Sequence, residues 1–215
     1  INQKQTSPSV TMADLARAFL RQDPDVILVG EIRDLETADV AIRAAATGHV
    51  VLSTLHTADA LGAVHRLRGL NLEADQIAES LLGVVAQRLI RRICRECIAP
   101  AEITDAHRKR LGVLLEGVEP KQGTGCSACS FTGYKGRIGI YELLVIDVDL
   151  QDEIAEGVHV HDLRELLGMQ GYYSLVDDAI DKARRGVSTL DEVLRVLPFR
   201  YLKSAVDRAE LTARD

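Results

Sequence analysis

The chain contains no tryptophan, and aromatic residues make up only 4% of its 215 positions. We therefore expect hydrophobic cores built from aliphatic side chains. No apolar run approaches the ~20 residues that span a bilayer, and no basic segment followed by an apolar one marks a secretory signal. Neither a membrane span nor a signal peptide is expected in these residues. The hydrophobic and charged fractions, 47% and 27%, are ordinary for a soluble globular protein.

A phosphate-binding loop of the form G-x-x-x-x-G-K-[S/T] is also absent from these residues. The chain by itself is therefore not expected to hydrolyse ATP. It begins with Ile1, and its first ten residues, INQKQTSPSV, are not typical of the start of a domain. We expect it to be a piece of a longer protein.

The chain also has no excess of basic residues, and its formal net charge is −6. This balance argues against a nucleic-acid partner for the chain as a whole. One basic cluster stands out, and it consists of Arg88, Arg91, Arg92 and Arg95. We interpret it as a solvated helix face, with contact to an anionic membrane surface as the alternative.

The pattern that is present centres on residues 21–57. Two apolar runs without polar alternation, residues 26–29 and 50–52, predict strands buried on both faces, as in a parallel sheet covered by helices. The Ala-rich stretch between them, residues 35–47, has no Gly or Pro and suits a crossover helix. The predicted fold class is α/β. Ligands bind at the carboxyl ends of such strands, where Glu31 and His56 lie.

The rest of the chain is predicted to be mostly helical, with a composition change at Cys94. Thr57 is a candidate N-cap for the helix that follows the second strand. Helices are expected over residues 11–22, 58–68, 73–93, 105–115, 161–169, 175–185 and 190–196, and a strand or hairpin arm over residues 136–144. We expect three parts, which are residues 1–93, 94–145 and 146–215.

An apolar strand that ends in an acid has the shape of a Walker B segment. A carboxylate at this position can orient the attacking water, accept its proton and hold the water shell of Mg²⁺ near a γ-phosphate. This makes Glu31 the candidate catalytic residue. The alternative is an ordinary acid at a strand end that pairs with Arg33.

Two histidines bracket the second strand. His49 and His56 are seven residues apart, about 23 Å in an extended chain, so they cannot share one ligand unless the backbone turns between them. We expect His49 at the start of the strand and His56 at its carboxyl end, nearer Glu31. A structural, hydrogen-bonded role is the alternative for each.

The four cysteines are the strongest local signal. They form two C-x-x-C pairs, separated by 28 residues, and comprise Cys94, Cys97, Cys126 and Cys129. Two such pairs can complete a tetrahedral shell of four thiolates around a structural Zn²⁺. The spacing exceeds the usual one, which the helix expected over 105–115 explains. Disulfides and redox use of one pair are the alternatives.

In three segments the sequence resembles the secretion ATPases of type II secretion and type IV pilus assembly, the GspE/PilB group. The segments are LRQDPDVILVGEIRDLETADVAIRAAATGHVVLSTLHTADA, AQRLIRRIC with the cysteine pairs, and GYKGRIGIYELL. The resemblance extends over residues 1 to about 197. Retraction ATPases of the PilT type share only the first part and lack the cysteines, which favours the assembly or secretion branch.

The resemblance implies a partial RecA-like P-loop NTPase core, followed by a tetracysteine zinc module and a small helical region. It implies that Glu31 is the Walker B glutamate, that His49 and His56 are the His-box pair, and that the cysteines hold zinc. The residues that it places at the nucleotide are Gly30, Arg33, Thr57 and Gln87. The family's Walker A loop would precede Ile1.

The function implied is that of a motor ATPase. Such an enzyme uses ATP and Mg²⁺, assembles as a homohexamer, and acts in the cytoplasm at inner-membrane assembly-platform proteins. Its hydrolysis drives pseudopilus or pilus assembly, with no nucleic-acid partner. The alternative is that these residues alone are a zinc-stabilised interaction module that binds no nucleotide.

Overall fold

The computed structural model describes residues 2–212, which form two compact units. The first contains the residues up to Val84 together with Leu144–Leu166, and the second contains Val85–Leu143 and the residues from Leu167 onward. None of the helices in the described range is long and apolar enough to cross a bilayer. The three parts expected from the sequence were defined by sequence motifs, whereas the two units are defined by contacts in the structure. The division into three parts stays a prediction.

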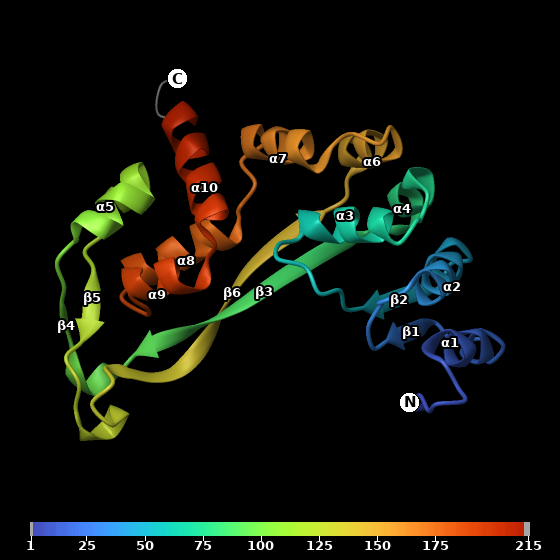
Figure 1. Ribbon diagram of the computed structural model, residues 1–215, viewed down its shortest axis with the longest axis horizontal. Helices are drawn as coiled ribbons and strands as arrows, with labels where there is room; N and C mark the ends of the chain where they lie inside the picture. Colours follow the sequence, from blue (N-terminus) through green and yellow to red (C-terminus); the bar gives the residue numbers. More distant parts are fainter. Residues whose placement is uncertain (1, 213–215) are drawn as a thin grey trace. The chain divides into compact units, whose positions relative to one another are not determined.

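The first unit is built around a strand–helix–strand segment (Figure 1). Strands β1 and β2 pair in parallel, in the register Val26↔Val50 to Val29↔Ser53, and helix α2 connects them. This confirms the predicted crossover. The elements of this unit are α1 (Met12–Leu20), β1 (Val26–Val29), α2 (Leu35–Ala46), β2 (Val50–Ser53), α3 (Leu61–Gly69), α4 (Ala74–Ser80), α6 (Val148–Ala155) and α7 (Val160–Met169), which ends in the second unit.

Only one face of β1 is buried, so the prediction of strands covered on both faces is wrong for the described residues. Ile27 and Val29 pack in a cluster with Ala44 of α2. Val26 and Leu28 point the other way and are 55% and 74% exposed. Two paired strands with one open apolar face are marginal as a sheet by themselves.

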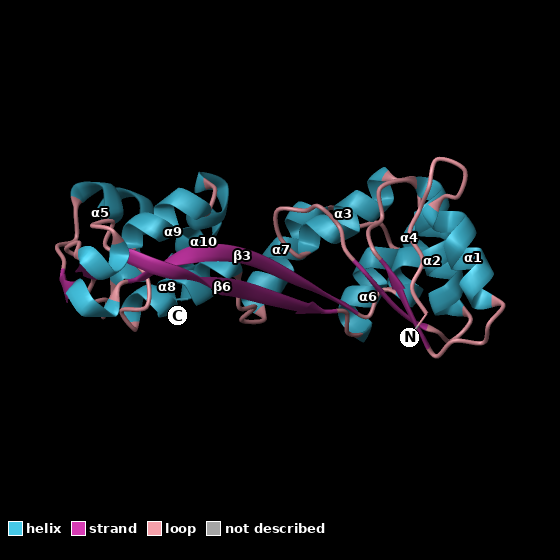
Figure 2. Ribbon diagram, turned by 90° about the horizontal axis from the view of Figure 1, so that it is seen from below, coloured by secondary structure: helices cyan, strands magenta, loops and turns pink. Residues whose placement is uncertain are grey.

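The second unit contains a helical layer and two strand pairs, of which β3 and β6 have their residues 83–84 and 144–145 in the first unit. β3 and β6 pair with one another, and β4 pairs with β5 in antiparallel fashion. Figure 2 shows β3 and β6 side by side in magenta. The elements are β3 (Gly83–Ile93), η1 (Arg95–Cys97), β4 (Ile98–Pro100), α5 (Asp105–Leu111), η2 (Gly112–Leu115), β5 (Lys121–Gly123), η3 (Ser127–Cys129), β6 (Tyr134–Val145), α8 (Leu175–Arg184), α9 (Leu190–Val196) and α10 (Phe199–Thr212).

The core of this unit is aliphatic, as expected from the composition. Ile90 of β3 and Ile140 of β6 are fully buried against Ala179 of α8 and Val193 of α9. No aromatic side chain is among the buried hydrophobic residues of positions 2–212. Close packing of branched side chains therefore has to stabilise the unit without large rings.

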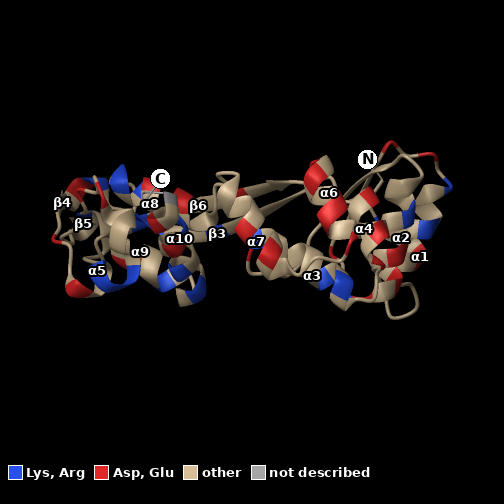
Figure 3. Cartoon of the chain, turned by 90° about the horizontal axis from the view of Figure 1, so that it is seen from above, with Lys and Arg blue, Asp and Glu red and all other residues tan. Residues whose placement is uncertain are grey.

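Residues 73–93 differ from the predicted single helix. The structure has the short helix α4 and then strand β3, in which alternate residues from Val84 to Ile90 turn inward. Their apolar residues fit a helical spacing, but pairing with β6 gives the backbone partners that lie outside any local window. The basic cluster thus lies on and just after a strand, and its interpretation as a helix face is wrong. Figure 3 shows acidic and basic residues interspersed on the helices of each unit.

A buried carboxylate connects α9 to β3. The Glu192 side chain is 0% exposed and accepts hydrogen bonds of 2.7 Å from Nε of Arg91 and 2.7 Å from Nε of Arg195. Burial alone raises the pKa of Glu192, but the hydrogen bonds from Arg195 and Arg91 outweigh it and lower the pKa to about 2. Glu192 is therefore ionised at neutral pH and is held between two guanidinium groups.

We expect Glu192→Gln to lower the free energy of unfolding by about 2–3 kcal/mol at neutral pH, because charge-assisted hydrogen bonds are lost. In the wild type this stabilisation is fully present above the unfolded carboxyl pKa of 4.5 and is lost as the pH falls towards about 2. Urea unfolding followed by circular dichroism at pH 7 and pH 3 measures both effects. Glu119→Gln, at an exposed position of the same unit, is the control. Equal stability of Glu192→Gln and wild type at pH 7 would contradict the prediction.

Candidate functional site

The parallel register brings the carboxyl ends of β1 and β2 to one edge. Val29 is opposite Ser53, so Gly30 and Thr54 leave their strands together. The Thr54 hydroxyl donates to the Gly30 carbonyl at 2.8 Å, and the Ile32 N–H donates to the Thr54 carbonyl at 3.0 Å. The loops that follow the two strands are therefore held side by side, as expected for a site at this edge.

Glu31 and His56 meet at this edge. Nε2 of His56 lies 3.2 Å from Oε2 of Glu31, and Nε of Arg33 lies 2.7 Å from the same oxygen. The hydrogen bond from Arg33 lowers the pKa of Glu31, and His56 lowers it further. The structure thus contains both the Arg33 pair and a carboxylate–imidazole contact. A carboxylate that is ionised at neutral pH and 30% exposed can accept a proton from water.

His49 lies at the other end of β2. It precedes Val50, and its Nδ1 lies 3.0 Å from the Ala44 carbonyl and 3.1 Å from the Thr47 hydroxyl. The ring is thus anchored to the end of α2. The predicted placement of the two histidines at opposite ends of the strand is confirmed, and the structure does not bring His49 to Glu31.

The four residues expected at the nucleotide are placed separately. Gly30 lies at the edge and accepts the Thr54 bond, and Arg33 contacts Glu31. Thr57 follows His56, and its hydroxyl donates to the Asp59 carbonyl at 3.0 Å. Gln87 belongs to the second unit, where its amide donates to the Tyr141 hydroxyl at 3.0 Å.

Thr57 does not cap α3, contrary to the prediction. The helix begins only at Leu61, and the side chain of Asp59 accepts the N–H of Gly62 at 2.7 Å. Sequence reasoning missed Asp59, although an Asp just before a helix is a common capping residue. The Thr57 hydroxyl instead donates to the Asp59 carbonyl.

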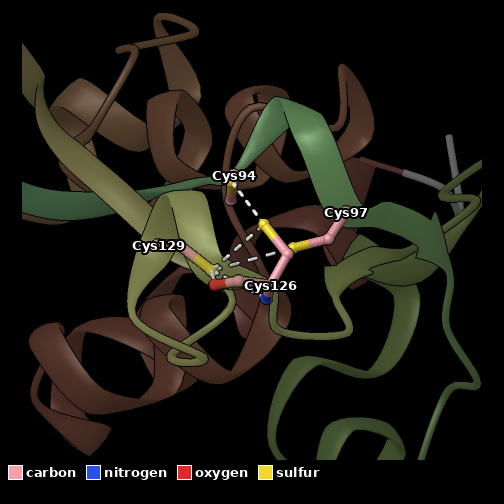
Figure 4. A group of neighbouring side chains, drawn as sticks. All are labelled: Cys94, Cys97, Cys126 and Cys129. Carbon is pink, nitrogen blue, oxygen red and sulfur yellow. Dashed lines mark hydrogen bonds between the residues drawn. The ribbon is translucent and has the colours of Figure 1, made fainter.

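The four cysteines converge in the second unit (Figure 4). The Sγ atoms of Cys94 and Cys126 are 3.9 Å apart, as are those of Cys97 and Cys129, and all four lie within 4.8 Å of one another. These distances leave all four thiols free of disulfides. Zn–S bonds of about 2.3 Å in a tetrahedron place sulfurs about 3.8 Å apart. The donor set therefore fits a four-coordinate zinc ion.

The backbone around the cysteines favours a thiolate at one of them. The N–H of Cys126 donates to Sγ of Cys129 at 3.2 Å, which lowers the pKa of Cys129 to about 6. Burial raises the pKa of Cys97 to about 11. Four thiolates in this space repel one another, and a dication relieves that repulsion.

Comparison with known proteins identifies the family to which this arrangement belongs. The family described as "Type II/IV secretion system protein" matches residues 1–195. The chain belongs to this family. The strand edge with Glu31 and His56 and the four cysteines all fall within the matched residues.

Two relatives illustrate the breadth of the family. The chain is 46% identical over 199 residues to the type II secretion system ATPase E of Vibrio cholerae, covering 91% of the chain and 39% of that protein. It is 44% identical over 199 residues to the type IV pilus assembly ATPase PilB of Thermus thermophilus, covering 90% of the chain and 22% of that protein. The chain thus spans well under half of the length of either relative.

Solved structures of related ATPases share the fold. The pilus retraction motor PilT with bound ADP has a TM-score of 0.61 and 28% identity, over 87% of this chain and 44% of PilT. The ATPase DotB of Legionella pneumophila has the same TM-score at 24% identity, over 87% of this chain and 42% of DotB. These neighbours support a mixed α/β fold for this chain.

Proposed function

We propose that this chain is the carboxy-terminal part of a longer motor ATPase, which is called the full-length protein below. The full-length protein is proposed to power the assembly of a type II secretion pseudopilus or of a type IV pilus. The observation that carries the proposal is the contact between Glu31 and His56 at the carboxyl edge of two parallel strands, in a chain that belongs to a family of secretion ATPases. In this proposal the chain supplies one side of a nucleotide site. A phosphate-binding loop elsewhere in the full-length protein supplies the other.

The proposed reaction is hydrolysis of Mg·ATP. Glu31 orients the attacking water and accepts its proton. His56, which contacts Glu31, and His49, at the far end of β2, relay the state of the γ-phosphate to the surrounding helices. The proposed nucleotide contacts of the first unit are completed by Gly30, Arg33 and Thr57. Gln87 belongs to the second unit, and a role for it at the nucleotide stays a prediction from the resemblance.

The open face of β1 supports the assignment to a larger core. Leu28 and Val26 are apolar and more than half exposed, and burying such side chains stabilises a fold by about 1.5–3 kcal/mol each. In the full-length protein we propose that further strands and helices of a RecA-like core cover this face. The part of the chain that contains β1 would then be one portion of a larger core and not a complete domain.

A second part of the proposal concerns the cysteines. We propose that residues 94–145 form a zinc module in which Cys94, Cys97, Cys126 and Cys129 hold a structural Zn²⁺. Four ligands fill its shell, so the metal has no open position for substrate. Its contribution is to stabilise a short-stranded region that has little core of its own.

We further propose how the full-length protein is placed in the cell. It forms a homohexamer and acts in the cytoplasm, peripherally at the inner membrane. Its partners there are the assembly-platform proteins, and residues 146–215 form a helical region that follows the core and the zinc module in the chain. Family membership and the secretion and pilus-assembly ATPases among its relatives support this assignment.

Two measurements test the proposed function. The full-length protein should hydrolyse Mg·ATP, whereas calorimetric titration of these 215 residues alone should show no Mg·ATP binding, because they lack a phosphate-binding loop. Absence of hydrolysis by the full-length protein, with the zinc module intact, would instead favour the alternative of a zinc-stabilised interaction module. Clear binding of Mg·ATP by the 215 residues would contradict the proposed division of the site.

A further inference from the structure

A buried carboxylate lies directly behind the loop that carries His56. The side chain of Asp59 is only 4% exposed. Its Oδ1 accepts the N–H of Gly62 at 2.7 Å, and its Oδ2 accepts from Nη2 of Arg164 at 2.5 Å. A buried carboxylate is stable in a fold only when it is paired and hydrogen-bonded. Both of its oxygens meet that condition here.

The space around this carboxylate is tight. A Cβ on Gly62 would lie 2.8 Å from Oδ1 of Asp59 and 3.2 Å from Cβ of Thr57. The carboxylate is thus held between the start of α3 on one side and Arg164 of α7 on the other. Removing the arginine or adding a methyl group at Gly62 would displace the same carboxylate by two independent routes.

Asp59 in turn shapes the loop after β2. Its carbonyl accepts the hydroxyl of Thr57, the residue that follows His56. His56 itself is 82% exposed, so packing around its ring does little to fix it. Besides its own contact with Glu31, the position of His56 therefore depends on the hydrogen bond between Thr57 and Asp59 in the residues that follow it.

Helix α3 connects the two loops of the candidate site to α6. Nη2 of Arg66 donates to the Arg33 carbonyl at 3.1 Å, in the loop after β1. Arg68, two residues further, donates to the carbonyls of Ile154 and Val158 at 2.8 and 2.7 Å, at the end of α6. Both arginines lie in the last turn of α3. All these residues belong to the first unit.

We infer that Asp59 and Arg164 are positioning residues. They fix the position of the His56 loop relative to Glu31, and they tie that position to helix α7. The inference rests on the proposed function, because it assigns the pair a role in ATP hydrolysis. Neither residue touches the reacting atoms. Their effect is on the geometry of His56, and a shift of about 1 Å in such a group can cost about 10²-fold in rate.

The test uses four variants of the full-length protein. Arg164→Gln removes the charge, Arg164→Lys retains it, and Gly62→Ala displaces the carboxylate from the opposite side. Gly69→Ala is the matched control, since it is the same change in the same helix at a position with no atom within 4 Å of the added Cβ. Steady-state Mg·ATP hydrolysis gives kcat and KM, and hydrogen exchange with mass spectrometry reports the amides of residues 57–62.

We expect kcat to fall about tenfold or more in Arg164→Gln and Gly62→Ala, with KM changed less than about twofold, because the phosphate-binding loop is unaffected. Exchange over residues 57–62 should accelerate in the same two variants. Arg164→Lys should recover part of kcat, and Gly69→Ala should match the wild type in both measurements.

Unchanged kcat with accelerated exchange would overturn the inference, because the loop would then be loose without consequence. Unchanged exchange in Arg164→Gln and Gly62→Ala would overturn it too, as would a loss confined to KM. A wild-type protein without hydrolysis is a separate outcome. It would overturn the proposed function and the role in hydrolysis, while the exchange data would still show whether Arg164 holds the loop.

Discussion

Replacement of Glu31 by glutamine in the full-length protein is expected to abolish ATP turnover and leave nucleotide binding intact. Glutamine preserves the size of the side chain but cannot accept a proton from water. General-base catalysis contributes about 10²–10⁴-fold, so kcat should fall by at least about 10². Binding should persist, because the phosphate cradle is proposed to lie outside this chain. Phosphate release and equilibrium titration with Mg·ATP measure the two quantities separately.

Glu36→Gln is the matched control for this change. Glu36 lies on α2, its side chain is 55% exposed, and it pairs with Arg17 at 2.9 Å. Exposed pairs of this kind contribute about 0–1 kcal/mol, so turnover should be unaffected. Hydrolysis at the wild-type rate in Glu31→Gln would remove Glu31 from the catalytic assignment, even if the family assignment stands.

Removal of the metal should have the largest structural effect. We expect elemental analysis to find about one zinc per chain, and Cys129→Ser to lose it. Structural zinc in small peptides contributes about 10–16 kcal/mol of apparent binding free energy, comparable to the net stability of a whole domain of about 5–15 kcal/mol. The strands β4 and β5, of three residues each, should therefore unfold locally. Limited proteolysis between residues 94 and 133 would then accelerate.

The aliphatic core of the second unit should survive that change. Ile90, Ile140 and Val193 are buried without any contribution from the cysteine cluster, so most of the helical circular dichroism should remain. Ser127→Ala, at an exposed position between two of the cysteines, controls for changes in the knuckle itself. A metal-free preparation with wild-type resistance to proteolysis would rule out a structural zinc.

Local signals were enough for much of this fold. Thr104 and Thr189 accept backbone N–H groups at the starts of α5 and α9, which is the usual role of Thr just before a helix. The apolar runs of β1 and β2 and the helix between them were predicted within a residue or two. Each of these features depends on neighbours a few residues away, and capping and chain direction are therefore readable from a short window.

The candidate site was also partly readable. Strand ends in a parallel pair must share an edge, and so the amino-acid sequence alone was enough to place Glu31 and His56 together. Two C-x-x-C pairs likewise predicted that four thiols would converge. Their roles in hydrolysis and in metal binding remain predictions.

Only tertiary structure decided the rest. Residues 83–93 carry an apolar spacing that suits a helix, and pairing with β6 made them a strand. Asp59 became a buried anchor because Arg164, far along the chain, reaches it. By itself the sequence determined where most helices and the first two strands lie. It also determined which side chains, Glu31 and His56, follow those two strands. The partners of β3, Asp59 and Glu192 were set by contacts between distant residues, whose energies no local pattern encodes.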